Sequence, residues 1–257
     1  MAYIDKFSLK GKVALVTGTS TGLGQGITLA YVQAGAKVVG VDYMAEQADT
    51  AAKVKALGGD FTAVQADLIK ATPADLQALI QKAVEAYGKL DILVNNAGII
   101  KRQDILEFSK ENWDSVMAIN LDAVFYLSQA AANQFVKQGH GGKIISIASM
   151  LSYQGGIRVP SYTASKSAVK GITMAFANEL AKHQINVNAI APGYMATNNT
   201  QALRDDENRA GQILERIPAG RWGTPDDVAG PAVFLASEAA SYINGFTLAV
   251  DGGWLAR

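Results

Sequence analysis

The sequence predicts an α/β protein built on one doubly wound, parallel, seven-stranded sheet with helices on both faces. Short runs rich in Val and Ile alternate with longer helical stretches along the whole chain. Most of these runs lack a polar alternation, which is typical of strands covered by helices on both sides. The alternation has no linker, repeat or low-complexity tract, so residues 1–257 are expected to form a single domain.

The same alternation places each element. Strands are expected at residues 12–17, 37–42, 61–66, 91–95, 142–148, 185–190 and 246–250. Helices are expected at residues 22–34, 44–57, 73–87, 109–137, 161–183, 199–216 and 225–236. Two of these helices begin with Thr-Pro followed by acidic residues, at Thr72 and Thr224. The Thr side chain can cap free backbone amides there, and Pro occupies the first turn without losing a hydrogen bond.

The composition excludes several classes of function. The chain has 23 basic and 23 acidic residues and therefore no formal net charge, so neither nucleic acid nor a membrane is expected as a partner. It has no cysteine and two histidines, which excludes thiolate catalysis, disulfides and a three-histidine metal site, and no metal is expected. Residues 1–14 carry four charges and no apolar segment, so we expect a soluble, cytoplasmic protein without a signal peptide.

A glycine-rich turn joins the first predicted strand to the first predicted helix. Gly18 permits a tight turn, Gly22 lets a pyrophosphate approach the backbone, and Gly24 lets helix and strand pack closely. The helix N-terminus then offers free N–H groups to phosphates. The spacing, Gly-x3-Gly-x-Gly, differs from G-x-G-x-x-G. The position of the turn therefore carries the prediction of a Rossmann-type dinucleotide site.

An acidic residue, Asp42, ends the second predicted strand. A carboxylate at this position can accept hydrogen bonds from both hydroxyls of an adenosine ribose and would repel a 2′-phosphate. Neither Thr21 nor Tyr43 brings a basic group nearby. The sequence therefore favours NAD over NADP, with a merely solvated Asp42 as the alternative.

A Ser, a Tyr and a Lys fall where chemistry is expected. Ser149 ends the fifth predicted strand, and Tyr162 and Lys166 open the following helix, on one face of it. A cation about 4 Å from a phenol can lower its pKa by about 3 units at an effective dielectric constant of 20, so Lys166 is expected to activate Tyr162 without a metal. His140 and His183 are expected in a loop and at a helix end. Most isolated Tyr-x3-Lys pairs are only helix surface, and the joint placement with Ser149 favours catalysis.

Further motifs accompany this set, and together they resemble the short-chain dehydrogenase/reductase family over essentially the whole chain. They are Asp67, the Asn-Asn-Ala-Gly motif at 95–98, Asn120, Pro192-Gly193 and Thr197. The resemblance implies that Tyr162 donates and accepts the proton, that Lys166 activates it and binds a ribose, and that Ser149 binds the carbonyl. It also implies that Asn120 belongs to a proton relay.

The same resemblance implies an extended NAD-binding site. Its residues would hold the pyrophosphate, the adenine side and the nicotinamide, and they are Gly18, Thr19, Ser20, Thr21, Gly22, Leu23, Gly24, Asp42, Asp67, Leu68, Asn95, Ala97, Gly98, Tyr162, Lys166, Pro192, Gly193, Met195 and Thr197.

Residues 148–162, 191–200, 216–222 and 251–257 resemble the sugar-acid dehydrogenases of that family more closely. This resemblance implies the NAD(H)-dependent interconversion of 2,5-diketo-3-deoxygluconate and 2-keto-3-deoxygluconate. Such a substrate is an anion whose carboxylate lies several bonds from the reacting carbonyl, so it needs a cationic anchor at some distance from Tyr162. Arg158, in the loop before Tyr162, is the first candidate because a guanidinium can hold a carboxylate bidentately, and Arg102 is the second.

Other functions remain open. They are a dehydrogenase of gluconate, polyols or hydroxysteroids, a 3-oxoacyl carrier-protein reductase, and a non-catalytic NAD-sensing protein. Asp42 and the absence of net charge argue against the carrier-protein reductase, and the intact Ser149, Tyr162 and Lys166 set argues against the sensor. The helix expected at 109–137 is apolar on more than one stripe, and the family implies a homotetramer built on such helices.

Overall fold

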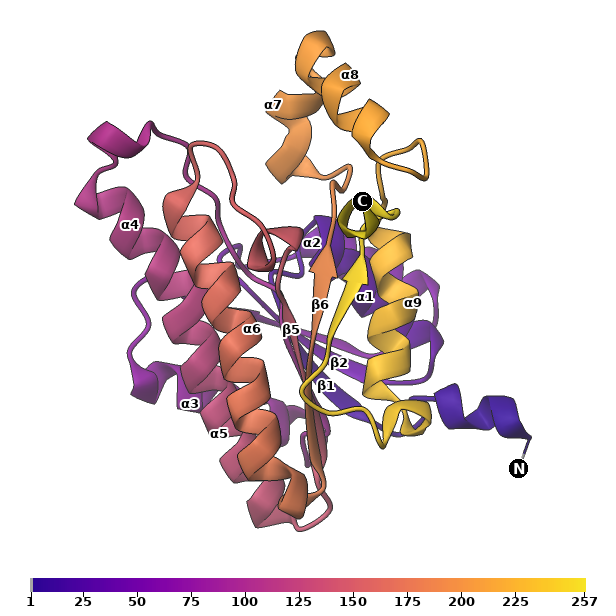
Figure 1. Ribbon diagram of the computed structural model, residues 1–257. Helices are drawn as coiled ribbons and strands as arrows, with labels where there is room; N and C mark the ends of the chain where they lie inside the picture. Colours follow the sequence, from indigo (N-terminus) through magenta and orange to yellow (C-terminus); the bar gives the residue numbers. More distant parts are fainter. Residues whose placement is uncertain (1) are drawn as a thin grey trace.

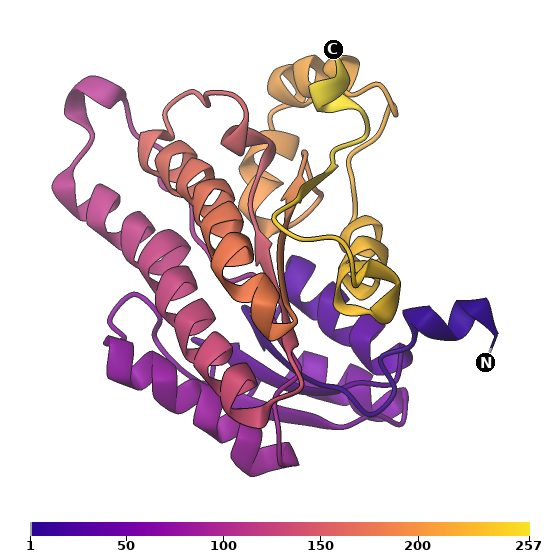
Figure 2. The ribbon, with the colours of Figure 1, turned by 60° about the horizontal axis from the view of Figure 1, so that its bottom comes forward.

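The computed structural model describes residues 2–257, so Met1, the first residue of the expected domain, lies outside the described residues. Seven parallel strands form one sheet in the order β3-β2-β1-β4-β5-β6-β7 (Figures 1 and 2). The predicted fold class is thereby confirmed. The strands are β1 (Val13–Thr17), β2 (Lys37–Asp42), β3 (Phe61–Gln65), β4 (Ile92–Asn95), β5 (Gly142–Ile147), β6 (Ile185–Pro192) and β7 (Thr247–Val250).

Helices cover both faces of this sheet (Figure 1). They are α1 (Gly22–Gln33), α2 (Ala48–Ala56), α3 (Pro73–Tyr87), α4 (Lys110–Met117), α5 (Ala123–Gln138), α6 (Pro160–Leu180), α7 (Gln201–Arg204), α8 (Glu207–Arg216) and α9 (Pro225–Ala236). Helices α1, α2 and α9 contribute to the core on one face, and α3, α5 and α6 contribute to the core on the other. Leu15 of β1 lies between Val39 of β2 and Leu93 of β4, and all three are completely buried. This explains the continuous apolar runs in the sequence.

Two helices differ from the prediction: one begins later than expected, and the other is divided into two. The helix expected from residue 44 begins at Ala48, since Gln47 has a left-handed backbone (φ 43°) and a buried side chain that donates to the Gly40 and Val64 carbonyls. The helix expected over 199–216 is divided into α7 and α8. Asp206 caps α8 by accepting a hydrogen bond from the Arg209 N–H at 3.0 Å.

The helix expected over 109–137 is also divided, at a π-helical turn (Ala118–Asp122) between α4 and α5. Asn120 in this turn directs its amide at the backbone of Ile99, accepting from its N–H and donating to its carbonyl. A π-turn inserts one extra residue into a helix and often marks a functional site. The interruption places Asn120 against the loop after β4.

The remaining differences lie at strand ends. β5 ends at Ile147, so Ser149 follows the strand and caps a short 3₁₀ turn (Met150–Ser152), where its Oγ accepts a hydrogen bond from the Leu151 N–H. At the start of α3, the Thr72 hydroxyl accepts from the Asp75 N–H at 3.3 Å, as expected. The cap expected from Thr224 is not formed, because its hydroxyl donates to the Asp227 carboxylate at 3.0 Å instead. Within residues 2–257, no helix is both long and apolar enough to cross a membrane.

Candidate active site

A cleft of about 650 Å³ runs across the carboxyl ends of the central strands. Chain order reverses between β1 and β4, and in open parallel sheets ligands bind in the crevice at such a reversal. Twelve expected site residues line the cleft: Gly18, Thr21, Gly22, Leu23, Asp42, Asp67, Leu68, Ala97, Gly98, Tyr162, Lys166 and Thr197. Among residues 2–257, including those of the cleft, no three His, Cys, Asp or Glu side chains lie together as they would around a metal ion.

The glycine turn has the shape of a phosphate cradle. A Cβ at Gly24 would lie 2.0 Å from the Gly18 carbonyl oxygen, so a side chain there would force α1 away from β1. Gly22 begins α1 with φ +60°, a backbone conformation that favours glycine, and a Cβ there would only touch a Thr197 methyl at 3.7 Å. The Ser20 Oγ in the same turn is buried without a hydrogen-bond partner. These features fit a bound pyrophosphate, which would supply the acceptors that the turn lacks.

Two carboxylates line the end of the cleft at β2 and β3. Asp42 accepts hydrogen bonds from the Ser20 N–H at 2.9 Å and from the Met44 N–H at 3.1 Å, so the glycine turn fixes its position. Asp67 accepts from the Ile69 N–H at 3.0 Å. Tyr43, which sequence reasoning treated only as an uncharged neighbour, also lines this end and is largely exposed.

Asn95 does not reach the cleft, contrary to the expected contact with the adenine side. Its side chain is buried and donates to the hydroxyls of Ser128 at 3.0 Å and Ser146 at 3.2 Å. The next residue, Asn96, lines the cleft and donates to the Thr17 carbonyl at 2.8 Å. Successive strand residues point to opposite faces, so the sequence could not show which Asn faces the ligand without the exact strand end.

The loop after β6 closes the cleft beside the glycine turn. Thr197 lines the wall together with Asn198 and Asn199, two neighbours that sequence reasoning missed. Three expected residues of this segment, Pro192, Gly193 and Met195, are not among the lining residues and instead shape its backbone. For example, a Cβ at Gly193 would lie 2.7 Å from the Cα of Asp251.

Lys166 is buried under the cleft floor. Its Nζ donates to the Ile147 carbonyl at 2.5 Å and lies 5.6 Å from the centre of the Tyr162 ring. Burial lowers the pKa of this ammonium group to about 8. Asn120 approaches from the other side: its Oδ1 and the Lys166 Nζ lie 2.9 and 3.8 Å from the point that a Cβ at Gly98 would occupy. Gly98 therefore leaves room for both groups.

The environment of Tyr162 differs from the expectation that Lys166 alone lowers its pKa. Burial raises the pKa of the phenol above its ordinary value, and the Ser149 hydroxyl and the charge of Arg102 oppose that rise. The Lys166 ammonium is turned towards Ile147 in this structure. The structure thus brings Ser149, Tyr162 and Lys166 together as expected, and adds Arg102 as a second cation whose charge acts on the phenol.

The two candidate anchor arginines have different surroundings. Arg102 donates to the Asn199 carbonyl at 3.2 Å and so bridges to the cleft wall. Arg158 has a left-handed backbone (φ +63°) and its guanidinium pairs with Asp104 at 3.3 Å in an exposed salt bridge. Its carbonyl accepts from the Gln103 N–H at 3.0 Å. Arg158 therefore connects its own loop to the loop that contains Gln103 and Asp104. The sequence around Asp104 did not indicate this contact.

Comparisons with known proteins agree with this geometry. The sequence model of a family described as enoyl-(acyl carrier protein) reductase matches residues 18–255. The 2-dehydro-3-deoxy-D-gluconate 5-dehydrogenases of Dickeya dadantii and Escherichia coli are 63% and 62% identical to this chain, each over 99% of both chains. A crystal structure from Agrobacterium tumefaciens, assigned to a 2-deoxy-D-gluconate 3-dehydrogenase and holding NADP, is 53% identical. It has a TM-score of 0.92, over 98% of this chain and 99% of that one.

The chain thus belongs to the short-chain dehydrogenase/reductase family and is an oxidoreductase. Its cleft is a site for a nicotinamide cofactor, as in the Agrobacterium structure.

Proposed function

We propose that this protein is an NAD(H)-dependent dehydrogenase that interconverts a ketone and a secondary alcohol on a sugar acid. The proposed pair is 2,5-diketo-3-deoxygluconate and 2-keto-3-deoxygluconate. The observation that carries the proposal is the placement of the Tyr162 phenol beside Ser149 and above buried Lys166, at the floor of a dinucleotide-shaped cleft. The two relatives that are over 60% identical support the choice of substrate.

The residues of this chain supply the acid–base part of the reaction. The bound nicotinamide accepts or supplies the hydride. Tyr162 gives its proton to the carbonyl oxygen in reduction and takes it back in oxidation. Because burial raises the pKa of the phenol, Tyr162 holds its proton at neutral pH, as a general acid must. The Ser149 hydroxyl holds the carbonyl oxygen in place.

Lys166 and Asn120 support the phenol from below. With a pKa of about 8, the Lys166 ammonium remains mostly charged at neutral pH and favours the phenolate that forms when the proton leaves. The Asn120 amide is held by the Ile99 backbone and donates to the Ser165 hydroxyl at 3.2 Å. We include Asn120 in the proton path because its Oδ1 and the Lys166 Nζ approach the same point beside Gly98.

The cofactor is NAD rather than NADP in this proposal. Asp42 lies at the end of β2, and the one basic side chain among the residues that line the cleft, Lys166, lies beneath β5. β1 and β4 lie between those strands, so the two charges are separated by about 14 Å at the usual strand spacing. A 2′-phosphate would therefore meet the Asp42 carboxylate without a compensating cation. The Agrobacterium relative holds NADP, so the choice needs a direct test.

Cofactor preference follows from steady-state kinetics with NADH and NADPH. We expect kcat/KM to be at least tenfold higher with NADH, because NADPH loses the ribose hydrogen bonds and meets a like charge. Asp42→Ala combined with Tyr43→Arg should shift the preference towards NADPH, whereas Tyr43→Arg alone should shift it less. Equal kcat/KM for both cofactors in the parent enzyme would refute this part of the proposal.

Arg102 is the proposed anchor for the substrate carboxylate. Its charge acts on the Tyr162 phenol, whereas the Arg158 guanidinium is already paired with Asp104. Both arginines were candidates from the sequence, with Arg158 first, and the pairing of Arg158 with Asp104 supports placing Arg102 first instead.

The substrate is tested by following NADH consumption with a panel of ketones. We expect the highest kcat/KM with 2,5-diketo-3-deoxygluconate, a lower value with 5-ketogluconate, and little turnover of a neutral ketone of similar size. A preference for 5-ketogluconate would assign the enzyme to the gluconate dehydrogenases and would contradict the proposed substrate while leaving the reaction type intact.

The proposed assembly is a homotetramer. Helices α5 and α6 carry exposed apolar side chains at Tyr126, Val136 and Met174, and Phe125 packs edge-on against Tyr126 and Phe176 between the two helices. A second copy of the same face would cover these groups and form a dimer. The second contact that a tetramer needs is proposed at the C-terminal strand and its tail, as the family implies. Light scattering at micromolar concentration should give four times the chain mass, and a monomer would contradict the proposal.

A further inference from the structure

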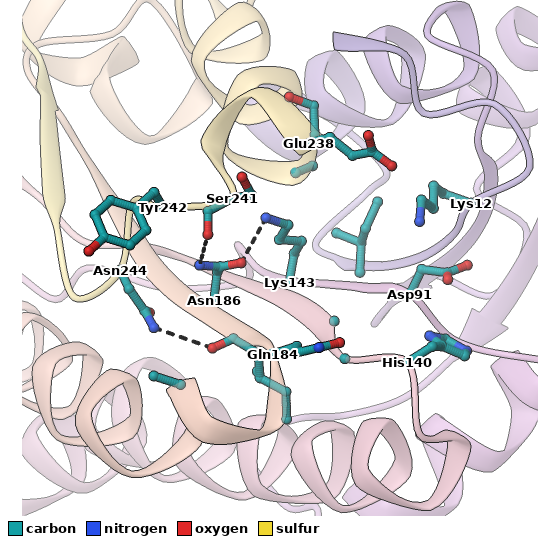
Figure 3. A pocket seen from close by; sticks show the side chains of 17 residues that line it. Lys12, Asp91, His140, Lys143, Gln184, Asn186, Glu238, Ser241, Tyr242 and Asn244 are labelled. Carbon is teal, nitrogen blue, oxygen red and sulfur yellow. Dashed lines mark hydrogen bonds between the residues drawn. The ribbon is translucent and has the colours of Figure 1, made fainter. Parts of the chain in front are cut away.

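A second cavity, of about 710 Å³, lies at the amino ends of the strands, away from the cofactor cleft (Figure 3). Residues at the starts of β1, β4, β5 and β6 line it, together with the segment that follows α9. Its wall is rich in polar side chains, and none of them belongs to the expected active site. They are Lys12, Asp91, His140, Lys143, Gln184, Asn186, Ser237, Glu238, Ser241, Tyr242 and Asn244.

Lys143, at the second position of β5, is held in this cavity by a neutral partner. Its Nζ donates to the Asn186 Oδ1 at 2.8 Å. The Asn186 amide nitrogen donates to the carbonyls of Ser241 at 3.0 Å and Ile243 at 3.1 Å, which fixes its oxygen towards Lys143 (Figure 3). Between residues 2 and 257, no carboxylate forms a salt bridge with Lys143. An amide oxygen stabilises an ammonium group less than a carboxylate does.

The charged groups around Lys143 compensate its charge only in part. Lys12, which precedes β1, also lines the cavity and forms no salt bridge within the described residues. Asp91 is already bonded to the Val13 N–H at 2.8 Å and to the Lys89 ammonium at 2.9 Å. Glu238, exposed His140 and exposed Tyr242 complete the titratable groups on the cavity wall (Figure 3).

These surroundings change the acidity of the Lys143 ammonium. Burial and, to a smaller extent, the charge of Lys12 lower its pKa, Glu238 opposes both, and the resulting pKa is about 8. At pH 7.5 about a quarter of such groups are neutral amines, against about one in a thousand for an ordinary lysine. A neutral amine beside a cation is the arrangement that makes a lysine nucleophilic.

We propose that Lys143 is a modification site that takes an acyl group from small acyl phosphates, with Lys12 holding the phosphate. The two lysines have different roles. The neutral Lys143 amine is the nucleophile, and the charged Lys12 ammonium attracts the dianionic reagent. The cavity is large enough for a reagent the size of acetyl phosphate, and the polar side chains of its wall suit an anion with hydrogen-bonding oxygens.

The chemical step is a simple acyl transfer. The Lys143 Nζ attacks the acyl carbon, and a C–N bond forms while the C–O bond to phosphate breaks. The phosphate leaves with the electron pair, and the extra proton on nitrogen passes to water. The product is a neutral amide, and no group is oxidised or reduced.

The test is site-resolved acylation of the full-length protein in its native assembly. The protein is incubated with acetyl phosphate at pH 7.5, and peptide mass spectrometry gives the rate at each lysine. We expect Lys143 to react at least tenfold faster than Lys82, an exposed lysine of α3. The Lys143 rate should level off above about pH 8, whereas the Lys82 rate should continue to rise. A Lys143 rate equal to or below the Lys82 rate would overturn the proposal.

Three variants separate the roles of the neighbours. Lys12→Met should slow Lys143 acylation by acetyl phosphate at least fivefold, Lys12→Arg should restore it, and Glu238→Gln should accelerate it. p-Nitrophenyl acetate, an uncharged acyl donor, should be affected less by Lys12→Met, because no phosphate needs to be held. The Lys82 rate and NADH binding serve as controls for folding. An unchanged Lys143 rate in Lys12→Met, with both controls normal, would contradict the proposed role of Lys12.

Discussion

The two ends of β5 each hold a lysine of similar acidity. Lys143 at the amino end and Lys166 beneath the carboxyl end both have a pKa of about 8. Each donates to a neutral oxygen, the Asn186 side chain in one case and the Ile147 carbonyl in the other. The causes differ, because burial alone acts on Lys166, whereas Lys12 adds a like charge beside Lys143.

The difference teaches that a shifted pKa does not define a site by itself. At the carboxyl end, Lys166 lies below a phenol, next to a cleft that fits a dinucleotide. At the amino end, Lys143 lies among amides and hydroxyls with a second cation. From the groups around each lysine, we infer oxidation–reduction chemistry at the carboxyl end of β5 and acyl transfer at its amino end.

The largest expected difference between the two ends is in catalysis. Lys166→Met should lower kcat with 2,5-diketo-3-deoxygluconate and NADH at least a hundredfold, because the charge that favours the phenolate is lost. Lys143→Met, the matched change at the other end of the strand, should leave kcat within threefold of the parent value. Steady-state NADH assays measure both. A similar loss in the two variants would remove the distinction between the two ends.

The next effect concerns the arginines at the rim of the carboxyl end. Arg102→Lys should raise KM for the keto acid about tenfold, since a lysine cannot hold a carboxylate bidentately, while the affinity for NADH stays the same. Arg158→Lys should change KM less than twofold, because the Arg158 guanidinium pairs with Asp104 and is not among the groups that act on the Tyr162 phenol. If Arg158→Lys raised KM and Arg102→Lys did not, the anchor would be Arg158.

The smallest effect is on stability as a function of pH. The folded-state pKa of Lys166, about 8, lies below that of an unfolded lysine, so the folded protein is less stable when this lysine is charged. The contribution of Lys166 to the unfolding free energy is therefore fully present only above about pH 10.5 and is lost as the pH falls through 8. Between pH 7.5 and 9.5, the parent should gain about 2 kcal/mol in unfolding free energy relative to Lys166→Met. Lys143→Met should show the same trend with a smaller amplitude, because Lys143 is more exposed. Urea denaturation at both pH values measures this, and parallel pH profiles would contradict the assignment for Lys166.

Local patterns made much of this molecule predictable from the sequence. The glycine turn, Asp42 at a strand end, and Tyr162 four residues before Lys166 depend on spacings within one element or across one turn, which a single sequence displays. The apolar runs likewise predicted the parallel sheet, because the central strands β1 and β4 are buried on both faces.

Other features depend on contacts between distant segments and left no local signal. The π-turn at Asn120 exists because its amide meets Ile99, and Arg158 is occupied because Asp104 reaches it from another loop. The environment of Lys143 requires the starts of β1, β5 and β6 to lie side by side. Asn95 shows that even a local prediction can fail. The exact end of β4 decides which of two adjacent residues, Asn95 or Asn96, faces the cleft, and the sequence did not define that end.

The central claim is that the Tyr162 phenol carries the proton in the reaction at the carboxyl end of β5. The direct measurement is kcat for Tyr162→Phe, with Tyr153→Phe as the matched control. In the parent protein the Tyr153 hydroxyl donates to the Thr247 carbonyl, and Tyr153 does not line the cleft. We predict that Tyr162→Phe retains NADH binding and loses at least a thousandfold in kcat, whereas Tyr153→Phe stays within threefold of the parent. Near-normal turnover by Tyr162→Phe would contradict the mechanism.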